Sequence, residues 1–247
     1  MGAILRVDSL CKDFSGLEVL YRISVNIDEG ERHAIIGPNG SGKTTLFNII
    51  TGHYKPSRGA IYFFDRDITG WPPHKIARLG LSRSFQIINV FPKMTVYENV
   101  RNAMVSKFNR RVNWVTLLNR DKEIERESER IIGLLSLTEA RDVPASELSY
   151  GMQRHLEMAL TMARAPTLVM LDEPTAGLNS EETRDAVRLI RQLTEGKTLL
   201  MVEHDMEVVF NLADRITVLS YGRVLVTGTV DEIKNNEEVK KVYLGRR

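Results

Sequence analysis

The chain has 247 residues, of which 43% are hydrophobic and 27% are charged, so its composition fits a folded globular protein and excludes a disordered one. Its 34 basic and 32 acidic side chains give a formal net charge of +2, a balance that does not call for a nucleic-acid partner. The single cysteine, Cys11, excludes an internal disulfide framework and suits a reducing compartment.

The first part of the chain alternates short apolar segments with turn residues. Strands are predicted at residues 3–9, 20–27, 33–36 and 60–64, the first two in an antiparallel sheet. The strand at 33–36 runs directly into Gly37. Residues 44–51 then predict a helix that Gly52 closes.

Between about Pro72 and Ser146, helical patterns replace the short apolar segments of the first part of the chain. Helical patterns occupy residues 97–108 and 121–135, and the second pattern is dense in charges of both signs, as on a solvated helix face. Further apolar strands are predicted at residues 168–171, 198–202 and 216–219, with helical stretches between them. That alternation predicts a mostly parallel, doubly wound sheet into which a helical region is inserted.

A glycine-rich loop follows the strand at 33–36. The run Gly37-Pro38-Asn39-Gly40-Ser41-Gly42-Lys43-Thr44 fits the phosphate-loop pattern G-x-x-x-x-G-K-[ST] at every position. Glycines let backbone N–H groups approach phosphate oxygens, and the positive end of the following helix favours an anion. Lys43 can then reach the β- and γ-phosphates, and the Thr44 hydroxyl can ligate Mg²⁺. The strand before the loop and the helix after it are the context that this motif requires.

The strand predicted at 168–171 runs into two carboxylates, Asp172 and Glu173. At the C-terminal edge of a parallel sheet, such side chains face the ligand crevice. Asp172 is suited to hold Mg²⁺ through its water shell, and Glu173 is suited to polarise an attacking water. By itself the pair also fits a polar turn before Pro174, but the complete phosphate loop favours a nucleotide site.

Taken together, these residues point to a family: the chain resembles the ATPases of ABC transporters from end to end. Further motifs of that family stand in the expected order. They are Phe14 upstream of the loop, Gln86 in Ser84-Phe85-Gln86, the signature Leu148-Ser149-Tyr150-Gly151-Met152-Gln153, and His204 in Glu203-His204-Asp205. Each motif is a weak signal alone, and their joint order carries the resemblance.

The resemblance implies a role for each of these residues. ATP would be bound by a ring stacked on adenine, by the phosphate loop and by the signature, namely Phe14, Gly37, Pro38, Asn39, Gly40, Ser41, Gly42, Lys43, Thr44, Thr45, Ser149 and Gly151. The ligands of Mg²⁺ would be Thr44, Gln86 and Asp172. The catalytic residues would be Glu173, His204, Lys43 and Gln86, with Glu173 acting on water and His204 on the γ-phosphate.

The resemblance also implies an α/β fold with a single ABC ATPase domain over residues 1–247. A P-loop NTPase core with a mostly parallel sheet, together with an antiparallel β subdomain, would comprise about residues 1–86 and 147–247. An inserted α-helical subdomain would comprise about residues 87–146, continue into the signature helix, and provide the docking surface for a membrane partner.

One chain carries one phosphate loop and one signature, so it cannot complete a site by itself. The resemblance implies a dimer, of two copies or of one copy and a paralogue, that sandwiches two ATP molecules head to tail. The other implied partners are integral membrane permease subunits and an extracytoplasmic solute-binding protein. The resemblance implies no nucleic-acid partner.

The chain has no stretch close to the about 20 apolar residues that a transmembrane helix needs, and Met1–Asp8 lacks the pattern of a secretory signal. We therefore expect a soluble chain bound peripherally to the cytoplasmic face of the cell membrane.

Departures from the common family pattern indicate a subgroup. Tyr150 replaces a glycine of the signature, Met152 replaces a glutamine, and Asn179 stands where many members carry aspartate. Tyr150 and residues 176–179 resemble the ATPases that power uptake of branched-chain amino acids, as do residues 203–209. The sequence thus favours an ATPase that converts ATP and water to ADP and phosphate and energises import of branched-chain or related amino acids.

Two alternatives remain at this point. One is the ATPase of a lipopolysaccharide-export or other-solute ABC transporter, which residues 177–179 and 203–205 fit less well. The other is a soluble ABC protein acting on DNA or ribosomes. Such proteins usually carry tandem ATPase halves or long coiled-coil insertions, and neither is visible in this sequence.

Overall fold

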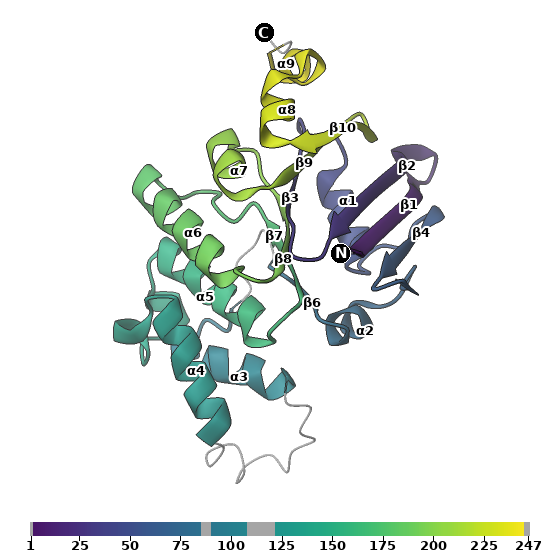
Figure 1. The fold of residues 1–247 in the computed structure, drawn as a ribbon. Helices are drawn as coiled ribbons and strands as arrows, with labels where there is room; N and C mark the ends of the chain where they lie inside the picture. Colours follow the sequence, from purple (N-terminus) through teal and green to yellow (C-terminus); the bar gives the residue numbers. More distant parts are fainter. Residues whose placement is uncertain (1, 85–89, 108–121, 245–247) are drawn as a thin grey trace. The chain divides into compact units, whose positions relative to one another are not determined.

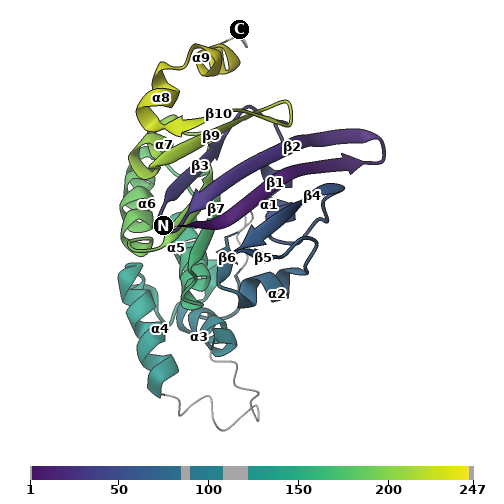
Figure 2. The ribbon, with the colours of Figure 1, turned by 45° about the vertical axis from the view of Figure 1, so that its right-hand side comes forward.

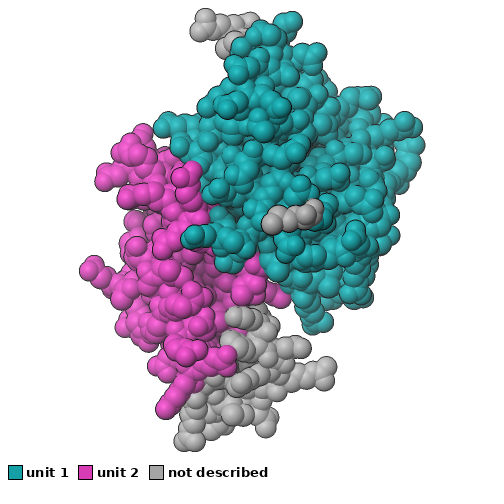
Figure 3. Space-filling model, in the orientation of Figure 1, with its two compact units in different colours: residues 1–83, 167–173, 194–247 teal, residues 84–166, 174–193 magenta. Residues whose placement is uncertain are grey.

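The computed structural model describes residues 2–84, 90–107 and 122–244 (Figure 1). The chain forms two compact units (Figure 3). Unit 1 contains residues 1–83, 167–173 and 194–247, and unit 2 contains residues 84–166 and 174–193. The chain therefore passes between the units four times, at 83/84, 166/167, 173/174 and 193/194.

Unit 1 is built around a six-stranded sheet with the order β10-β9-β3-β8-β7-β6. Its strands are β3 (Arg32–Ile36), β6 (Leu81–Arg83), β7 (Leu168–Asp172), β8 (Thr198–Val202), β9 (Arg215–Ser220) and β10 (Arg223–Thr229). All neighbours are parallel except β10 and β9. Every residue of β7 and β8 is buried, which explains their uninterrupted apolar sequences, since a strand covered on both faces has no polar side. The predicted mostly parallel sheet is confirmed.

A second sheet in unit 1 is antiparallel and has the order β2-β1-β4-β5. It consists of β1 (Ala3–Phe14), β2 (Leu17–Asp28), β4 (Arg58–Phe63) and β5 (Arg66–Asp67). Figure 2 shows β1 and β2 side by side as a long hairpin. Helix α1 (Lys43–Ile50) contributes Leu46 and Phe47 to one buried cluster that also contains residues of β1, β2, β3, β7 and β8. The helix that follows the phosphate loop is thus packed against both sheets, as the predicted fold requires.

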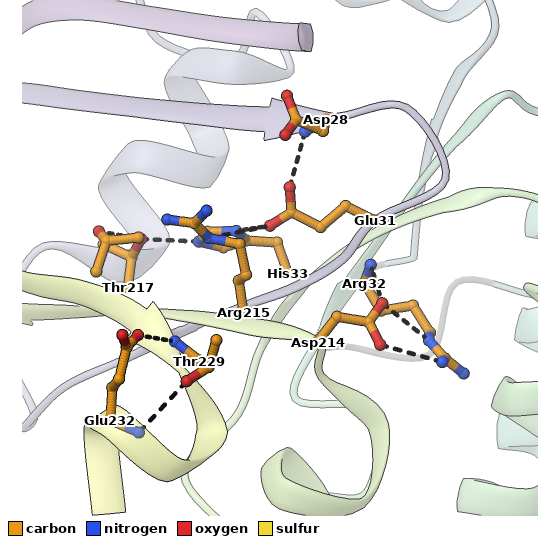
Figure 4. A network of polar contacts seen from close by, with 10 residues as sticks. Asp28, Glu31, Arg32, His33, Asp214, Arg215, Thr217, Thr229 and Glu232 are labelled. Carbon is orange, nitrogen blue, oxygen red and sulfur yellow. Dashed lines mark hydrogen bonds and ion pairs between the residues drawn. The ribbon is translucent and has the colours of Figure 1, made fainter. Parts of the chain in front are cut away.

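A buried chain of hydrogen bonds holds the start of β3 (Figure 4). The His33 ring is fully buried, with Nδ1 2.7 Å from Glu31 Oε1 and Nε2 2.7 Å from Thr217 Oγ1. Thr217 Oγ1 lies in turn 2.8 Å from Thr227 Oγ1 on β10. Burial by itself raises the pKa of Glu31, but hydrogen bonds from His33 and from the Asp28 N–H bring it below its usual value. The strand that leads into the phosphate loop is therefore anchored to β9 and β10.

The remaining helices of unit 1 are α2 (Pro73–Arg78), α7 (Met206–Leu212), α8 (Val230–Asn235) and α9 (Glu237–Leu244). Helix α8 begins with a capping box, in which Thr229 Oγ1 accepts from the Glu232 N–H and Glu232 Oε2 accepts from the Thr229 N–H. Figure 4 shows this cap beside the His33 network.

Unit 2 is helical. It contains α3 (Val96–Lys107), α4 (Lys122–Leu134), η2 (Thr138–Ala140), η3 (Ala145–Glu147), α5 (Tyr150–Ala163) and α6 (Ser180–Leu193). Helices α3, α4 and α5 pack on one another. On α4 the side chains of Ile124, Ile131 and Ile132 are buried while Glu123 and Glu125 are exposed, as predicted for a solvated charged face. None of the helices within the described ranges is long and apolar enough to cross a membrane.

Candidate nucleotide-binding site

The loop between β3 and α1 needs its glycines for different reasons. A Cβ on Gly37 would lie 2.2 Å from the Leu219 carbonyl oxygen, and one on Gly42 would lie 2.5 Å from Leu20 Cδ2. Gly40, with φ of +78°, would place a Cβ in open space. Neighbouring strands thus enforce two of the glycines, whereas the third leaves the loop backbone open to an approaching ligand.

Gly37→Ala is expected to destabilise unit 1 far more than Gly40→Ala. The methyl group added by Gly37→Ala meets the Leu219 backbone oxygen, which costs on the order of 3 kcal/mol, whereas Gly40→Ala adds only left-handed strain of about 1 kcal/mol. Thermal unfolding without nucleotide measures the difference, which we expect to be several degrees in Tm. Equal Tm values for the two variants would contradict this account of the loop.

Lys43 is the first residue of α1 and is buried. Its ammonium donates to the Gly37 carbonyl at 2.7 Å and to the Pro38 carbonyl at 3.1 Å. Burial lowers the pKa of Lys43, while the carboxylates of Glu173 and Asp172 act in the opposite direction. All three groups are therefore close enough to interact.

The Ser41 hydroxyl is buried in the same loop and has no hydrogen-bond partner among the described residues. An unsatisfied buried hydroxyl costs free energy, and a ligand with acceptor oxygens would satisfy it together with the loop N–H groups. This observation, with the open face at Gly40, fits the loop to a phosphate group. Thr44 is exposed on the first turn of α1, and Thr45 is half-buried behind it.

Asp172 and Glu173 lie at the end of β7, as predicted. The Asp172 side chain is 2% exposed and pairs with Arg83, whose Nη2 lies 2.6 Å from Asp172 Oδ2. Glu173 has a left-handed φ of +48°, and its N–H donates to the Val202 carbonyl at 2.9 Å. The sharp turn ends the strand at Glu173, whose side chain is more accessible than that of Asp172.

His204 follows β8 in a turn that its neighbours fix. Glu203 is fully buried, and its Oε2 accepts from the His204 N–H at 3.0 Å. Asp205 caps α7 by accepting from the Glu207 N–H at 2.8 Å. The His204 side chain is 61% exposed, with Nδ1 3.9 Å from Glu173 Oε2. The structure therefore brings the side chains of His204 and Glu173 together.

Phe14 ends β1 as a partly exposed ring, 39% accessible. Tyr54, which the sequence motifs did not single out, meets it edge-on with ring centroids 5.4 Å apart. The Lys12 ammonium lies 4.7 Å from the centre of the Phe14 ring. An exposed aromatic ring held in this way can stack on a flat base.

In unit 2, Ser149 caps the N-terminus of α5, where its Oγ accepts from the Met152 N–H at 3.3 Å. The Tyr150 hydroxyl donates to the Ala176 carbonyl at 3.2 Å and accepts from Arg154 Nη2 at 2.9 Å. A Cβ on Gly177 would lie 3.2 Å from the Tyr150 ring. Tyrosine in place of the usual signature glycine therefore ties the signature to the loop that begins at Ala176.

Asn179 forms hydrogen bonds that explain the presence of asparagine at this position. Its Oδ1 accepts from the N–H groups of Glu181 at 2.9 Å and Glu182 at 3.0 Å, and Glu182 Oε2 accepts from the Asn179 N–H at 2.9 Å. These bonds are a capping arrangement at the start of α6. Asparagine performs this role as well as the aspartate that many family members carry.

The proposed metal ligands fit Mg²⁺ in kind. Mg²⁺ keeps several waters and takes few protein oxygens beside substrate phosphates. Thr44 and Asp172 supply a hydroxyl and a carboxylate in unit 1, whereas Gln86 lies outside the described residues. The described part of the chain holds no group of three or more His, Cys, Asp or Glu side chains that could bind a metal. The hydroxyl of Thr44 and the carboxylate of Asp172 suit a hard cation that arrives with a nucleotide.

Comparisons with known proteins show which families and proteins the chain is similar to. Residues 20–176 match the family model "ABC transporter", and residues 223–247 match "Branched-chain amino acid ATP-binding cassette transporter". The high-affinity branched-chain amino acid transport ATP-binding protein LivG of Salmonella typhimurium is 40% identical over 98% of both chains. The lipopolysaccharide export system ATP-binding protein LptB of Acidithiobacillus ferridurans is 34% identical over 99% of this chain and 98% of its own.

Two solved structures resemble all or most of the chain. A crystal structure of an ATP-binding cassette of an ABC transporter in its ADP conformation has a TM-score of 0.85, with 28% identity and full coverage of both chains. A dimeric post-hydrolysis structure of an ATP-binding cassette bound to ADP and Pi has a TM-score of 0.78, with 26% identity over 92% of this chain and 98% of that one.

Proposed function

This chain belongs to the ABC transporter family of ATP-binding proteins, and from that premise we propose that it energises the import of branched-chain or related amino acids. The observation that carries the cargo assignment is the similarity to a branched-chain amino acid ATPase over 98% of both chains, higher in identity than that to the lipopolysaccharide-export protein. The match of residues 223–247 to a branched-chain amino acid family model supports the same assignment.

ATP is bound first through unit 1. Phe14 stacks on adenine, and its edge contact with Tyr54 keeps the ring oriented. The Lys43 ammonium, now held by two loop carbonyls, pairs with the β- and γ-phosphates. The N–H groups of the loop, the Ser41 hydroxyl and the N-terminus of α1 complete the phosphate cradle, which comprises Gly37, Pro38, Asn39, Gly40, Ser41, Gly42, Lys43, Thr44 and Thr45.

Hydrolysis is assigned to residues at the ends of β7 and β8. Bound Mg²⁺ would be held by Thr44, Asp172 and Gln86 and would neutralise charge on the phosphates. Glu173 accepts a proton from the attacking water as general base. His204, 3.9 Å from Glu173, contacts the γ-phosphate and steadies the reacting groups.

The site is completed by a second subunit. Ser149 and Gly151, at the N-terminus of α5, would present donors to the γ-phosphate bound by the other chain. The dimeric ADP- and Pi-bound cassette supports this arrangement, since its fold matches the present chain. The partner ATPase is a second copy or a paralogue.

Unit 2 is our candidate for contact with the membrane permease, which would place the chain peripherally on the cytoplasmic face of the cell membrane. Phe91 and Met94 are 56% and 37% exposed at the start of its described part. Tyr97 is less available, because the Arg141 guanidinium lies 4.1 Å from the centre of its ring. Trp114, an aromatic residue of the same inserted region, lies outside the described residues.

Co-purification followed by reconstitution tests the proposed function. The tagged chain, isolated from detergent-solubilised membranes, is expected to carry a polytopic permease and an ATPase partner. In proteoliposomes, a solute-binding protein loaded with leucine, isoleucine or valine should stimulate ATP hydrolysis, and the same protein without ligand should not. Recovery of lipopolysaccharide-export components would favour that alternative, and recovery of nucleic acid or ribosomes would contradict a transport role.

A further inference from the structure

Arg83 connects the helix of the phosphate loop to the acidic end of β7. It is the last residue of β6, and its side chain is 6% exposed. Nη1 donates to Asn48 Oδ1 at 2.7 Å and to Thr51 Oγ1 at 3.1 Å, while Nη2 donates to Asp172 Oδ2 at 2.6 Å. One guanidinium therefore joins α1, β6 and β7 within unit 1.

Arg83 donates to two neutral side-chain oxygens, that of Asn48 on α1 and that of Thr51 directly after it, and further contacts hold this end of the helix in place. Thr51 Oγ1 donates to the Phe47 carbonyl at 2.8 Å, and Arg83 Cζ lies 5.5 Å from the centre of the Phe47 ring. The Asn48 backbone carbonyl accepts from the N–H groups of His53 and Tyr54, which fixes the end of the helix. Two neutral oxygens hold Nη1 of the planar guanidinium, so Nη2 can hold a carboxylate in a fixed direction. A lysine ammonium lacks this planar geometry and cannot do the same.

The burial of Asp172 explains why a fixed cation is needed. Its side chain is 2% exposed, and a buried carboxylate that loses its cation is strongly disfavoured. Without Arg83, the buried Asp172 carboxylate would lose the cation that fixes its direction.

We infer that Arg83 is a positioning residue for the magnesium site. By holding Asp172 Oδ2, it directs the carboxylate toward the water shell of the metal. This inference rests on the proposed function, which assigns Asp172 to Mg²⁺. It assigns a task to an arginine that none of the nucleotide-binding motifs contains.

The test measures metal affinity apart from turnover. Mn²⁺ replaces Mg²⁺ and is followed by the electron paramagnetic resonance signal of the free ion, with ADP as the nucleotide. Arg83→Met is expected to raise the Kd of Mn²⁺ for the protein–ADP complex by about 10- to 100-fold, the usual effect of losing a partner that orients a metal ligand. ADP affinity in EDTA should stay unchanged, because the side chains to which Arg83 donates, those of Asn48, Thr51 and Asp172, lie outside the phosphate loop.

Two further variants separate positioning from stability. Arg83→Lys keeps the charge without the fork and should show an intermediate loss of Mn²⁺ affinity. Arg32→Met removes a different arginine–aspartate pair of unit 1, that with Asp214, and should bind Mn²⁺ like the parent. If Arg83→Met does not fold, Arg83→Lys decides by itself.

The outcomes distinguish a failure of the role inferred for Arg83 from a failure of the proposed function. Parent-like Mn²⁺ affinity in the folded Arg83 variants would overturn the inference, whatever happens to Tm, and would leave the proposed function intact. A parent chain that binds neither ADP nor Mn²⁺ would overturn both. Weakened Mn²⁺ binding with unchanged metal-free ADP binding supports a positioning role.

Discussion

Replacing Glu173 with glutamine is expected to slow ATP hydrolysis by about 10²- to 10⁴-fold, the contribution of a positioned general base. Glutamine has the size of glutamate but cannot accept the proton of the attacking water. Because Glu173 lies outside the phosphate loop, ATP binding should persist. With hydrolysis blocked, ATP should accumulate between two subunits and hold the dimer together.

Single-turnover hydrolysis and size-exclusion chromatography with Mg·ATP measure the two effects. The Glu173→Gln variant should elute as a dimer with ATP and as a monomer without it. Glu207→Gln is a suitable control, because this exposed carboxylate lies on α7 of the same unit and has no assigned role in catalysis. Turnover at the parent rate in Glu173→Gln would remove this residue from the position of base.

Lys43→Ala is expected to lower the rate of ATP hydrolysis on the order of 10²-fold or more, because a preorganised charge aimed at the phosphates is lost. The ammonium lies buried within the loop, where water screens its charge poorly. The effect should therefore exceed that of removing a surface charge. ATP affinity should fall as well, since the proposed contact of Lys43 with the phosphates forms before the reaction.

Steady-state hydrolysis and the binding of a fluorescent ATP analogue test this expectation. Lys43→Met retains most of the apolar stem and should fail in the same way, which assigns the loss to the charge. Lys75→Ala, an exposed lysine of α2, should behave like the parent. If Lys43→Met hydrolysed ATP normally, the phosphate loop would need a different interpretation.

Much of the fold could be predicted because local patterns and tertiary environment agree. The strands at 33–36, 168–171 and 198–202 are short apolar runs, and the structure extends them by no more than one residue. Helix α3 lies within one residue of the predicted 97–108. Strand β6 was not predicted, because its three residues are too few to show a period.

The candidate site was predictable where motifs are contiguous and was missed where partners are distant in sequence. Lys43, Asp172 and Glu173 stand in recognisable strings. Arg83 contacts residues 32, 35 and 89 positions away, so no local pattern could reveal its role. The available signal was a charged side chain in the strand-like segment 81–83, since a buried arginine requires an acidic or polar partner.

The backbone at 173/174, where the chain passes from unit 1 to unit 2, is conformationally restricted. Glu173 is the last residue of unit 1 at this point, and Pro174 is the first residue of unit 2. The ring of Pro174 locks its own φ and narrows the conformations open to Glu173, which already has a left-handed φ of +48°. The backbone that carries the Glu173 carboxylate is therefore confined to few conformations.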